Sequence, residues 1–566
     1  MKWRALRLHL LLVLAAVLVY GYGPFGEEYC YDGVIVLGPD SRIEKWADLG
    51  KVFSNDFGRL SGDLNFRPLA PLTFFIDSLV FQKSVFFSRL FNLVLHVLVG
   101  LSLFSLWKAI LRRHTLPFAA ALIFLIHPIA SETVLCVGFR KDLLSMLLTV
   151  WTVRLIWECW VRRNRGYGFA AALVWLLALL AKEPAFMAIA LAPLVLVYRR
   201  RLIAKDPEYA RHRGLMTGEK RQERDQDRAD ASYGLAERWQ RWIGRQLRFG
   251  WPIVATFVLL FGAWLFLYVQ FRTVEGFDYA AYTAQAHRFN FMAEDALREW
   301  PQDYGPGLRF LNFTHTLLLY MRLWIYPMDL SINHFYPPVD HYGDLDLWFS
   351  LALFVLLLIL SLRYYYRAEP AGLGAMWAFL CVAPICQVIP TPELVAERYV
   401  YPAHAGISLA LAVALLKIGQ NFVQLIPQQR VANPHFRWLR GNVNGRVFVL
   451  LALLVLGGIT MARTLHWRND LTLNLRAYEL WDHPEGRMRE GILLYAAGRK
   501  DEALDRLQEA VALQHDLADA WRVLGVIWLE KGQTGKAEDC FERAYRLEPL
   551  NPLNQNALEL LDSEMQ

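Results

Sequence analysis

Three acidic side chains follow the first apolar run of the chain. The stretch EEYCYDGVIVLGPD begins at Glu27 and places Glu27, Glu28 and Asp32 just beyond that run, with Asp32 between Tyr31 and Val34. A membrane protein has little structural need for a carboxylate at this position. A carboxylate can, however, accept the proton of a neighbouring hydroxyl group when that hydroxyl reacts. Asp32 is therefore a candidate for chemistry, and the alternative is an acid that is merely solvated in a loop.

Further polar residues occur where later apolar runs end. Five segments carry them: GDLNFRPLAPLTFFIDSL (62–79), RLFNLVLHVL (89–98), FLIHPIASETVLCVGFRKDLLSML (124–147), ALLAKEPAF (178–186) and TPELVAERYVYPAHAG (391–406). With the acidic stretch, this series resembles the transmembrane-and-tetratricopeptide-repeat protein O-mannosyltransferases and their bacterial relatives. These belong to the GT-C superfamily of glycosyltransferases, which use lipid-linked donors.

The resemblance rests on six motifs in one order. The family shows an early aromatic-Asp-Asp, a Tyr-Arg-Pro-Leu-x3-Thr-Phe stretch, an Asn-x3-His span, a His-Pro-x3-Glu…Arg-x-Asp-Leu-Leu block, a Lys-Glu pair and an Ala-Glu-Arg-x-x-Tyr block. The resemblance implies that Asp32 acts as the general base or orients the acceptor. The chain departs from the family one residue later, where Gly33 replaces the second Asp. A possible metal ligand or second acid is thereby lost, so a divalent metal is possible but is not indicated.

The resemblance also implies a set of residues that bind substrate. A lipid-phosphate leaving group needs fixed positive charge, which cations at outer span ends could supply. The alternative for Arg140, Lys182 and Arg398 is to snorkel to the interface or to pair with Asp142, Glu183 and Glu397. The complete set of candidates is Arg67, His127, Glu132, Arg140, Lys182, Glu397 and Arg398.

Other polar residues have competing structural explanations. His127 and Glu132 could bond a sugar or each other, and Arg67 could equally form an ion pair that fixes a loop. Asn92 and His96 lie four residues apart on one helical face, and we expect them to hold helices together.

The elements that must position these residues are membrane helices. The chain has 566 residues, of which 55% are hydrophobic and 14% aromatic, and it contains 20 Trp. Soluble domains rarely reach this composition. The net charge of +7 does not indicate nucleic-acid binding, because the basic residues form short blocks between apolar runs. The six cysteines show no zinc-binding spacing, and they predict no disulfide framework.

Charge asymmetry predicts the orientation of these spans. Basic blocks at RRH (112–114), RRNRGYG (162–168) and YRRR (198–201) would be cytoplasmic, as would the N-terminus and the loop 199–250. The first outer loop would then be 22–89. About twelve apolar runs could cross the membrane. If the N-terminus and the basic, acid-free stretch 417–446 are both cytoplasmic, the number of crossings between them must be even, so one of the runs must not cross. We expect 311–327, which contains Asn312, His315 and Arg322, to be that segment.

A self-match of 34 residues begins after the last apolar run. It aligns Gly491 with Gly525, Gly498 with Gly532 and Leu507 with Phe541, and the second unit shows the tetratricopeptide pattern. We expect additional helices over 469–482 and 553–563. Residues 1–463 would form the GT-C-like membrane domain and residues 464–566 the repeat domain.

We therefore expect an all-α protein: a polytopic membrane helix bundle of GT-C type with about 11–12 spans and a C-terminal tetratricopeptide-repeat α-solenoid. The resemblance implies transfer of a sugar from a polyprenyl-phosphate donor to a hydroxyl acceptor, plausibly protein Ser or Thr, on the outer face. The expected location is a bacterial inner membrane, with the repeats periplasmic and binding the acceptor or a partner. Two alternatives remain, namely a glycan or lipid acceptor and a non-catalytic membrane scaffold.

Overall fold

The structure is a computed structural model of the whole chain. It describes residues 2–31, 33, 37, 45–53, 66–112, 114–205, 235–272, 305–334, 338–386, 394–424, 443–549 and 553–557. These residues form helices and turns, and no strand occurs among them. The expectation of an all-α chain is confirmed.

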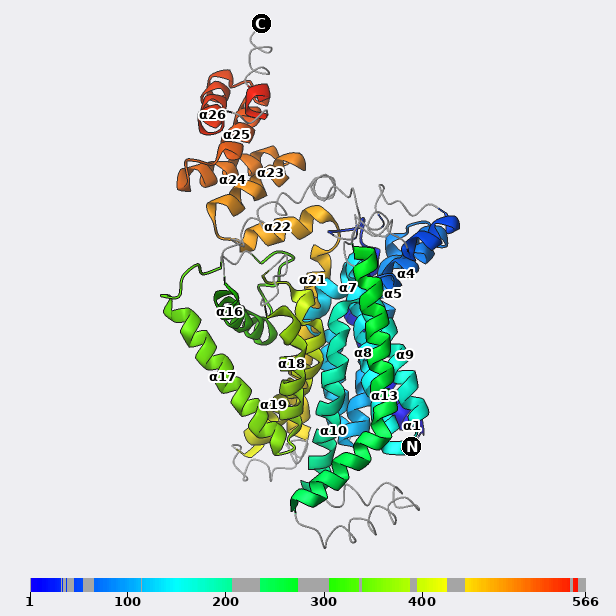
Figure 1. Cartoon of the computed structure of the whole chain (residues 1–566). Coiled ribbons are helices and arrows are strands. Elements are labelled where there is room, and N and C mark those ends of the chain that lie inside the picture. The colour runs from blue at the N-terminus through cyan, green and yellow to red at the C-terminus, as the bar shows by residue number, and fades with distance from the viewer. Residues whose placement is uncertain are drawn as a thin grey trace.

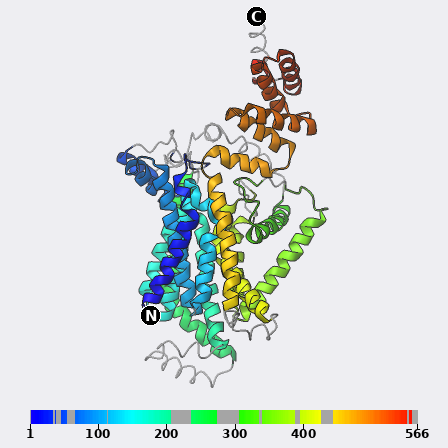
Figure 2. The same ribbon diagram turned by 180° about the vertical axis from the view of Figure 1, so that it is seen from behind.

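Helices of 12 to 38 residues form a bundle with two ends (Figure 1; Figure 2 shows the opposite face). They are α1 (Lys2–Tyr20), α5 (Val85–Leu111), α6 (Thr115–Ile126), α8 (Arg140–Arg162), α9 (Arg165–Ala181), α10 (Ala188–Lys205), α13 (Leu235–Arg272), α17 (Leu345–Tyr366), α18 (Pro370–Val382), α19 (Tyr401–Gln424) and α21 (Val443–His466). Short turns such as the one at Arg163 join antiparallel neighbours, because a tight connection leaves no room for any other arrangement.

Short elements gather at the end of the bundle opposite the N-terminus, here called the α22 end (Figure 1). They are α4 (Leu69–Leu79), η3 (Pro128–Ala130), α7 (Ser131–Leu135), η4 (Val137–Phe139), η5 (Glu183–Met187), η8 (Glu397–Val400) and α22 (Asp470–Leu480). The remaining short elements are η1 (Gly23–Phe25), η2 (Trp46–Phe53) and η7 (Ala383–Ile385).

Fewer helices qualify as spans than the sequence predicted. Among the described residues, six helices are long and apolar enough to cross a membrane, or up to eight if two bent pairs each form one span. The expected count of about 11–12 is higher because several helices of the bundle are short: Arg165–Ala181 and Pro370–Ile385 have fewer than 18 residues. Such short helices are tolerated inside a bundle, where neighbouring protein satisfies their ends.

Helix α16 (Pro306–Ile325) contains most of the segment 311–327. It lies across the α22 end, between the end of α13 and the start of α17, and does not run from one end of the bundle to the other (Figure 1). Its buried Asn312 fixes the chain that follows, because Asn312 accepts a hydrogen bond from the Val339 N–H (2.8 Å) and donates one to the Val339 carbonyl (2.9 Å). This arrangement fits a segment that does not cross.

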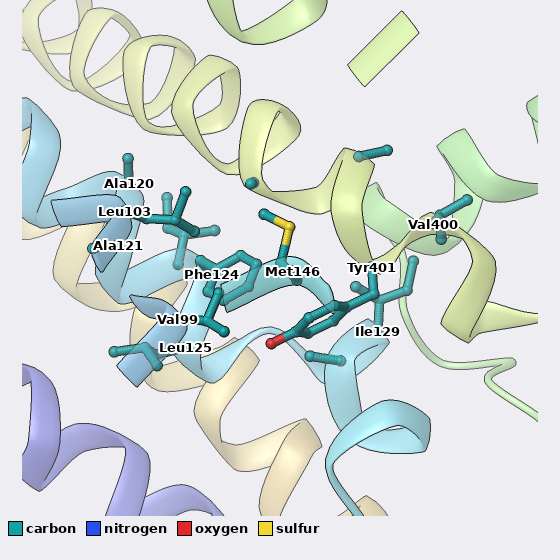
Figure 3. Close-up of a cluster of buried hydrophobic side chains, with 14 of the residues drawn as sticks. Val99, Leu103, Ala120, Ala121, Phe124, Leu125, Ile129, Met146, Val400 and Tyr401 are labelled. Carbon is teal, nitrogen blue, oxygen red and sulfur yellow. The ribbon is translucent and has the colours of Figure 1, made fainter. Parts of the chain in front are cut away.

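An apolar core lies beneath the α22 end. Phe124 and Leu125 of α6, Val99 of α5 and Met146 of α8 meet Tyr401 of α19 there (Figure 3). The Tyr401 hydroxyl lies 2.8 Å from His96 Nδ1, and Asn92 donates to the Cys136 carbonyl (3.0 Å). Asn92 and His96 thus hold helices together, as the sequence predicted.

The C-terminal helices form antiparallel pairs, α23 (Pro484–Ala496) with α24 (Lys500–Leu513) and α25 (Ala518–Glu530) with α26 (Thr534–Leu547). Gly498 and Gly532 have φ angles of +78° and +71° and allow the left-handed turn inside each pair. Residues 553–557 are helical, and α22 provides the helix expected over 469–482. The proposed boundary at 463/464 falls inside α21.

Candidate functional site

The site is built where η4, η8 and the start of η5 meet at the α22 end. The side chains of Arg67, Lys182 and Arg398 lie there, and each is 9–14% exposed. Each forms an ion pair with a carboxylate. These three pairs, Arg67–Glu183, Lys182–Asp142 and Arg398–Glu132, are here called the three cation pairs.

Arg398 makes the most buried of the three cation pairs. Its Nη1 donates to Glu132 Oε1 at 2.5 Å, and its backbone N–H donates to Glu132 Oε2 at 2.8 Å. The guanidinium stacks over the rings of Phe139 (4.4 Å) and Tyr399 (5.0 Å). A carboxylate and two aromatic faces thus hold this cation, so its charge is fixed in direction before any ligand binds.

Lys182 also lies near the Tyr399 ring, and Arg67 extends the site beyond Lys182. Lys182 Nζ lies 5.9 Å from the centre of the Tyr399 ring and 2.6 Å from Asp142 Oδ1. Arg67 donates from Nε and Nη2 to Glu183 at 2.7–3.0 Å. Burial lowers the pKa of the Lys182 ammonium group, Asp142 opposes this shift, and the positive charge of nearby Arg67 adds to it. The site therefore holds two cations near one another.

The segment that leads to Asp32 reaches the same place. The Tyr31 ring lies 6.0 Å from the Phe139 ring, on which Arg398 stacks. Asp32 itself lies outside the described residues, and its catalytic role stays a prediction. Gly33 is buried, and a Cβ atom built on it would lie 3.6 Å from the Tyr29 Cβ and 3.8 Å from the Val137 Cβ, which is ordinary contact.

Arg140 lies at the same end of the bundle but is completely buried. Its guanidinium contacts Asp77 Oδ2 at 2.5 Å, Asn92 Oδ1 at 2.8 Å, Thr73 Oγ1 at 3.1 Å and the Ser88 carbonyl at 3.0 Å. Protein groups therefore surround this cation, and they tie α4 to α5 and α8. The geometry favours a structural role over the expected contact with a lipid phosphate.

Glu397 belongs to a separate buried network. It accepts hydrogen bonds from Arg463 Nη2 (2.8 Å) and the Ser331 N–H (2.8 Å), and His334 Nε2 lies 3.2 Å away. Arg463 also donates to the Ser131 hydroxyl. The network joins α21 and α7 to η8, so Glu397 orients the element that carries Arg398.

His127 and Glu132 do not bond each other. His127 Nε2 lies 2.9 Å from the Trp324 carbonyl, and Nδ1 accepts from the Ile129 N–H at 3.2 Å. This ring therefore orders the turn into η3, whereas the Glu132 carboxylate serves Arg398.

The ion partners differ from the ones considered from the sequence. Asp142 pairs with Lys182, Glu183 with Arg67 and Glu397 with Arg463. Residues adjacent or two apart in a helix or turn do not face each other, so each cation reaches an acid on another element. Sequence reasoning missed Tyr399 and Phe139, although both stand in the quoted motifs.

Among the described residues, no group of three or more His, Cys, Asp or Glu side chains is placed to hold a metal ion.

Comparisons with known proteins agree with this picture at a coarse level. Residues 518–551 match the family model of the tetratricopeptide repeat. Protein O-mannosyl-transferase TMTC1 of Homo sapiens is 34% identical over 146 residues, which are 24% of this chain and 16% of the human protein. The protein of the same name from Mus musculus is 34% identical over 149 residues. No solved structure matches the chain.

A longer match has lower identity. Protein O-mannosyl-transferase F38B6.6 of Caenorhabditis elegans is 20% identical over 486 residues, which are 83% of this chain and 58% of the nematode protein. The chain thus spans less than two thirds of the curated relatives it matches. The similarity supports a relationship to proteins named protein O-mannosyl-transferases, and the chain itself is a helical protein with candidate membrane spans and a C-terminal tetratricopeptide repeat.

Proposed function

We propose that the protein is a membrane glycosyltransferase of O-mannosyltransferase type. It moves a sugar from a polyprenyl-phosphate donor to a hydroxyl acceptor, most simply Ser or Thr of a protein. The observation that carries the proposal is the three cation pairs, one of which, Arg398–Glu132, lies against the Phe139 ring that Tyr31 contacts. The named relatives support the same reaction class.

The chemical step is an inverting displacement. The acceptor oxygen attacks the anomeric carbon of the sugar, and the bond from that carbon to the phosphate oxygen breaks. The lipid phosphate leaves with the bonding electrons, and the Asp32 carboxylate takes the hydroxyl proton. General-base help of this kind contributes about 10²- to 10⁴-fold in rate.

The cations stabilise the leaving group. The Arg398 guanidinium and Lys182 Nζ lie 5.0 and 5.9 Å from the centre of the Tyr399 ring, and Arg67 lies near Lys182. Their carboxylate partners hold the cations in place, so the cations are oriented before the phosphate binds. Arg398 is held by Glu132, and its guanidinium would lie close to the departing phosphate.

The position of the C-terminal helices indicates where the acceptor would bind. The C-terminal helices lie at the same end of the bundle as the three cation pairs (Figure 1). Tetratricopeptide repeats bind other proteins, so this array would dock the acceptor or a partner. We place this end on the outer face, in the periplasm if the membrane is a bacterial inner membrane.

The test is sugar transfer by the purified full-length protein in liposomes. The probes are radiolabelled polyprenyl-phosphate mannose and a peptide rich in Ser and Thr. We expect transfer by the wild type and a loss of about 10²- to 10⁴-fold in Asp32→Asn, with donor binding unchanged. Asp56→Asn, an acid of the same outer loop, is the matched control and should retain full activity.

A cation variant separates donor binding from proton transfer. Arg398→Lys keeps the charge but loses the fork of donors, so it should weaken donor binding as well as turnover. Undiminished transfer in Asp32→Asn would overturn the assigned base. A wild type that transfers mannose to a glycan or lipid but not to the peptide would replace the protein acceptor, and no transfer to any acceptor would favour a membrane scaffold, for which Gly33 is the main support.

A further inference from the structure

Two segments far apart in the sequence join at the α22 end. The Glu27 N–H donates to the Arg468 carbonyl at 2.8 Å, and the Glu27 carboxylate accepts from Arg468 Nε (2.6 Å) and Asn469 Nδ2 (2.8 Å). The Glu28 carboxylate accepts from the Asp470 N–H at 2.8 Å. We call the contact between residues 27–31 and residues 467–470 the clasp.

The clasp also fixes the residue before Asp32. Tyr31 has a φ angle of +53°, in the left-handed region that a residue with a side chain rarely adopts. Its N–H donates to Asp470 Oδ1 at 3.1 Å. Such a conformation persists only where its surroundings hold it, and Asp470 supplies one of the holding contacts.

A second set of contacts, made by the helix bundle, holds residues 23–30. Arg89 is buried and donates to the Gly23 carbonyl (3.1 Å) and the Glu28 carbonyl (2.9 Å). The Cys136 thiol lies 3.6 Å from the Cys30 carbonyl. The bundle thus fixes residues 23–30, whereas residue 31 receives its N–H acceptor from α22.

Helix α22 leads from the clasp directly to the repeats. Asp470 is its first residue, and farther along it Leu475 and Tyr478 pack with Leu493 of α23. A displacement of the repeats therefore reaches Asp470 through one rigid helix of 11 residues.

We propose that Asp470 is a positioning residue that fixes the backbone at Tyr31, one residue before Asp32, and that it couples the C-terminal repeats to this segment. This inference rests on the proposed function. The carboxylate acts through a hydrogen bond to the Tyr31 N–H and does not contact substrate. When an acceptor docks on the repeats and shifts them, α22 and Asp470 carry that shift to the Tyr31 backbone and so to the adjacent base.

The first arm of the test compares two variants of one residue. Asp470→Ala removes the acceptor and should lower kcat for mannose transfer by roughly 10- to 100-fold, with KM for polyprenyl-phosphate mannose unchanged. Asp470→Asn keeps an oxygen that can accept the Tyr31 N–H and should retain most of kcat. Asp505→Ala, at an exposed position of α24, is the matched control and should change neither constant.

The second arm does not depend on activity. Hydrogen–deuterium exchange of the peptide that covers residues 27–33 should be faster in Asp470→Ala than in the wild type, Asp470→Asn or Asp505→Ala. Unchanged exchange in Asp470→Ala would overturn the proposed hold on residue 31.

The two arms distinguish the two proposals. A wild type that transfers mannose, together with an Asp470→Ala variant of unchanged kcat, overturns the positioning role alone. A wild type with no transfer overturns the proposed function and with it the catalytic part of this inference.

Discussion

At the scale of single residues, the pair Arg140–Asp77 carries the clearest energetic consequence. Both side chains are 0–1% exposed, and the cation also lies over the rings of Phe74 and Phe91. Removing one partner of a buried pair leaves an uncompensated charge, which costs about 3–5 kcal/mol. We expect Asp77→Ala to lower the thermal unfolding temperature of the detergent-solubilised protein strongly.

The control for this prediction is Asp346→Ala, an exposed acid at the start of α17, which should cost at most about 0.5 kcal/mol. The double variant Asp77→Leu with Arg140→Met replaces both charges by apolar groups and should recover much of the lost stability. An Asp77→Ala protein as stable as the wild type would show that the pair does not fasten α4 to the bundle.

Gly33 supports a second prediction at this scale. A methyl group fits between Tyr29 and Val137, so Gly33→Ala should fold with unchanged stability. Gly33→Asp adds a carboxyl group at a buried position, where burial raises its pKa above the unfolded value. The stability of this variant is then greatest below the unfolded pKa and falls as pH rises through the folded value.

The measurement is the unfolding temperature of the two Gly33 variants between pH 4 and pH 8. Gly33→Asp should lose more stability relative to Gly33→Ala at the alkaline end. A constant difference across this range would mean that a partner neutralises the added carboxylate.

The sequence predicted the cations of the three cation pairs, but it did not predict which acid pairs with which cation. Arg398 was recognised as a cation at a span end, but its acid lies 266 positions away in α7, whereas the adjacent Glu397 bonds Arg463. Partner choice depends on how η8 packs against α7 and α21, and no local pattern encodes that packing. Asp32 itself rests on the sequence resemblance alone.

At the scale of elements, the repeat helices pack through glycines. A Cβ atom on Gly525 would lie 2.4 Å from the Phe541 ring, and one on Gly491 would lie 2.6 Å from Leu507. Gly525→Ala therefore overpacks the α25–α26 contact and should cost about 1–3 kcal/mol. Limited proteolysis or hydrogen exchange of residues 518–547 in the full chain would measure this loss.

Gly535 of α26 is the matched control, because a Cβ atom there meets nothing within 4 Å. Gly535→Ala should be neutral or stabilising, since alanine favours the helix by up to about 1 kcal/mol. Equal protection in both variants would contradict the close helix approach at Gly525.

These glycines show why the repeats were predictable from sequence. The 34-residue self-match paired Gly491 with Gly525 and Leu507 with Phe541, and each glycine indeed faces the paired large side chain. Local sequence encodes this contact because each pair of helices is built from neighbouring residues. The bundle helices offered no such signal, since α6 ends after 12 residues and the next helical segment, Pro128–Leu135, is bent away from it by 53°. Hydropathy alone therefore does not show which of these bent or short helices form a complete span.

At the scale of the whole molecule, the two ends of the bundle differ in charge and in the elements that they carry. Arg199–Arg201 lie in the last part of α10, and Arg201 and Lys205 donate to the Tyr366 and Arg367 carbonyls between α17 and α18. The N-terminus of α1 lies at this basic end, opposite the three cation pairs and the C-terminal helices (Figure 1). The positive-inside rule therefore predicts that the basic end faces the cytoplasm.

The final prediction is the sidedness of two introduced cysteines. Gln508→Cys lies at an exposed position of α24, and Arg367→Cys lies at an exposed position of the basic end. In right-side-out vesicles, a membrane-impermeant maleimide should label Gln508→Cys at once, and it should label Arg367→Cys only after detergent opens the vesicles. Cys30, Cys136, Cys159, Cys381 and Cys540 are buried and should give little background, and the half-buried Cys386 is replaced by alanine in both variants. Labelling of both sites from one side would require an additional crossing, and α16 is the segment positioned to provide it. The reverse labelling pattern would put the three cation pairs in the cytoplasm and would exclude an acceptor on the outer face.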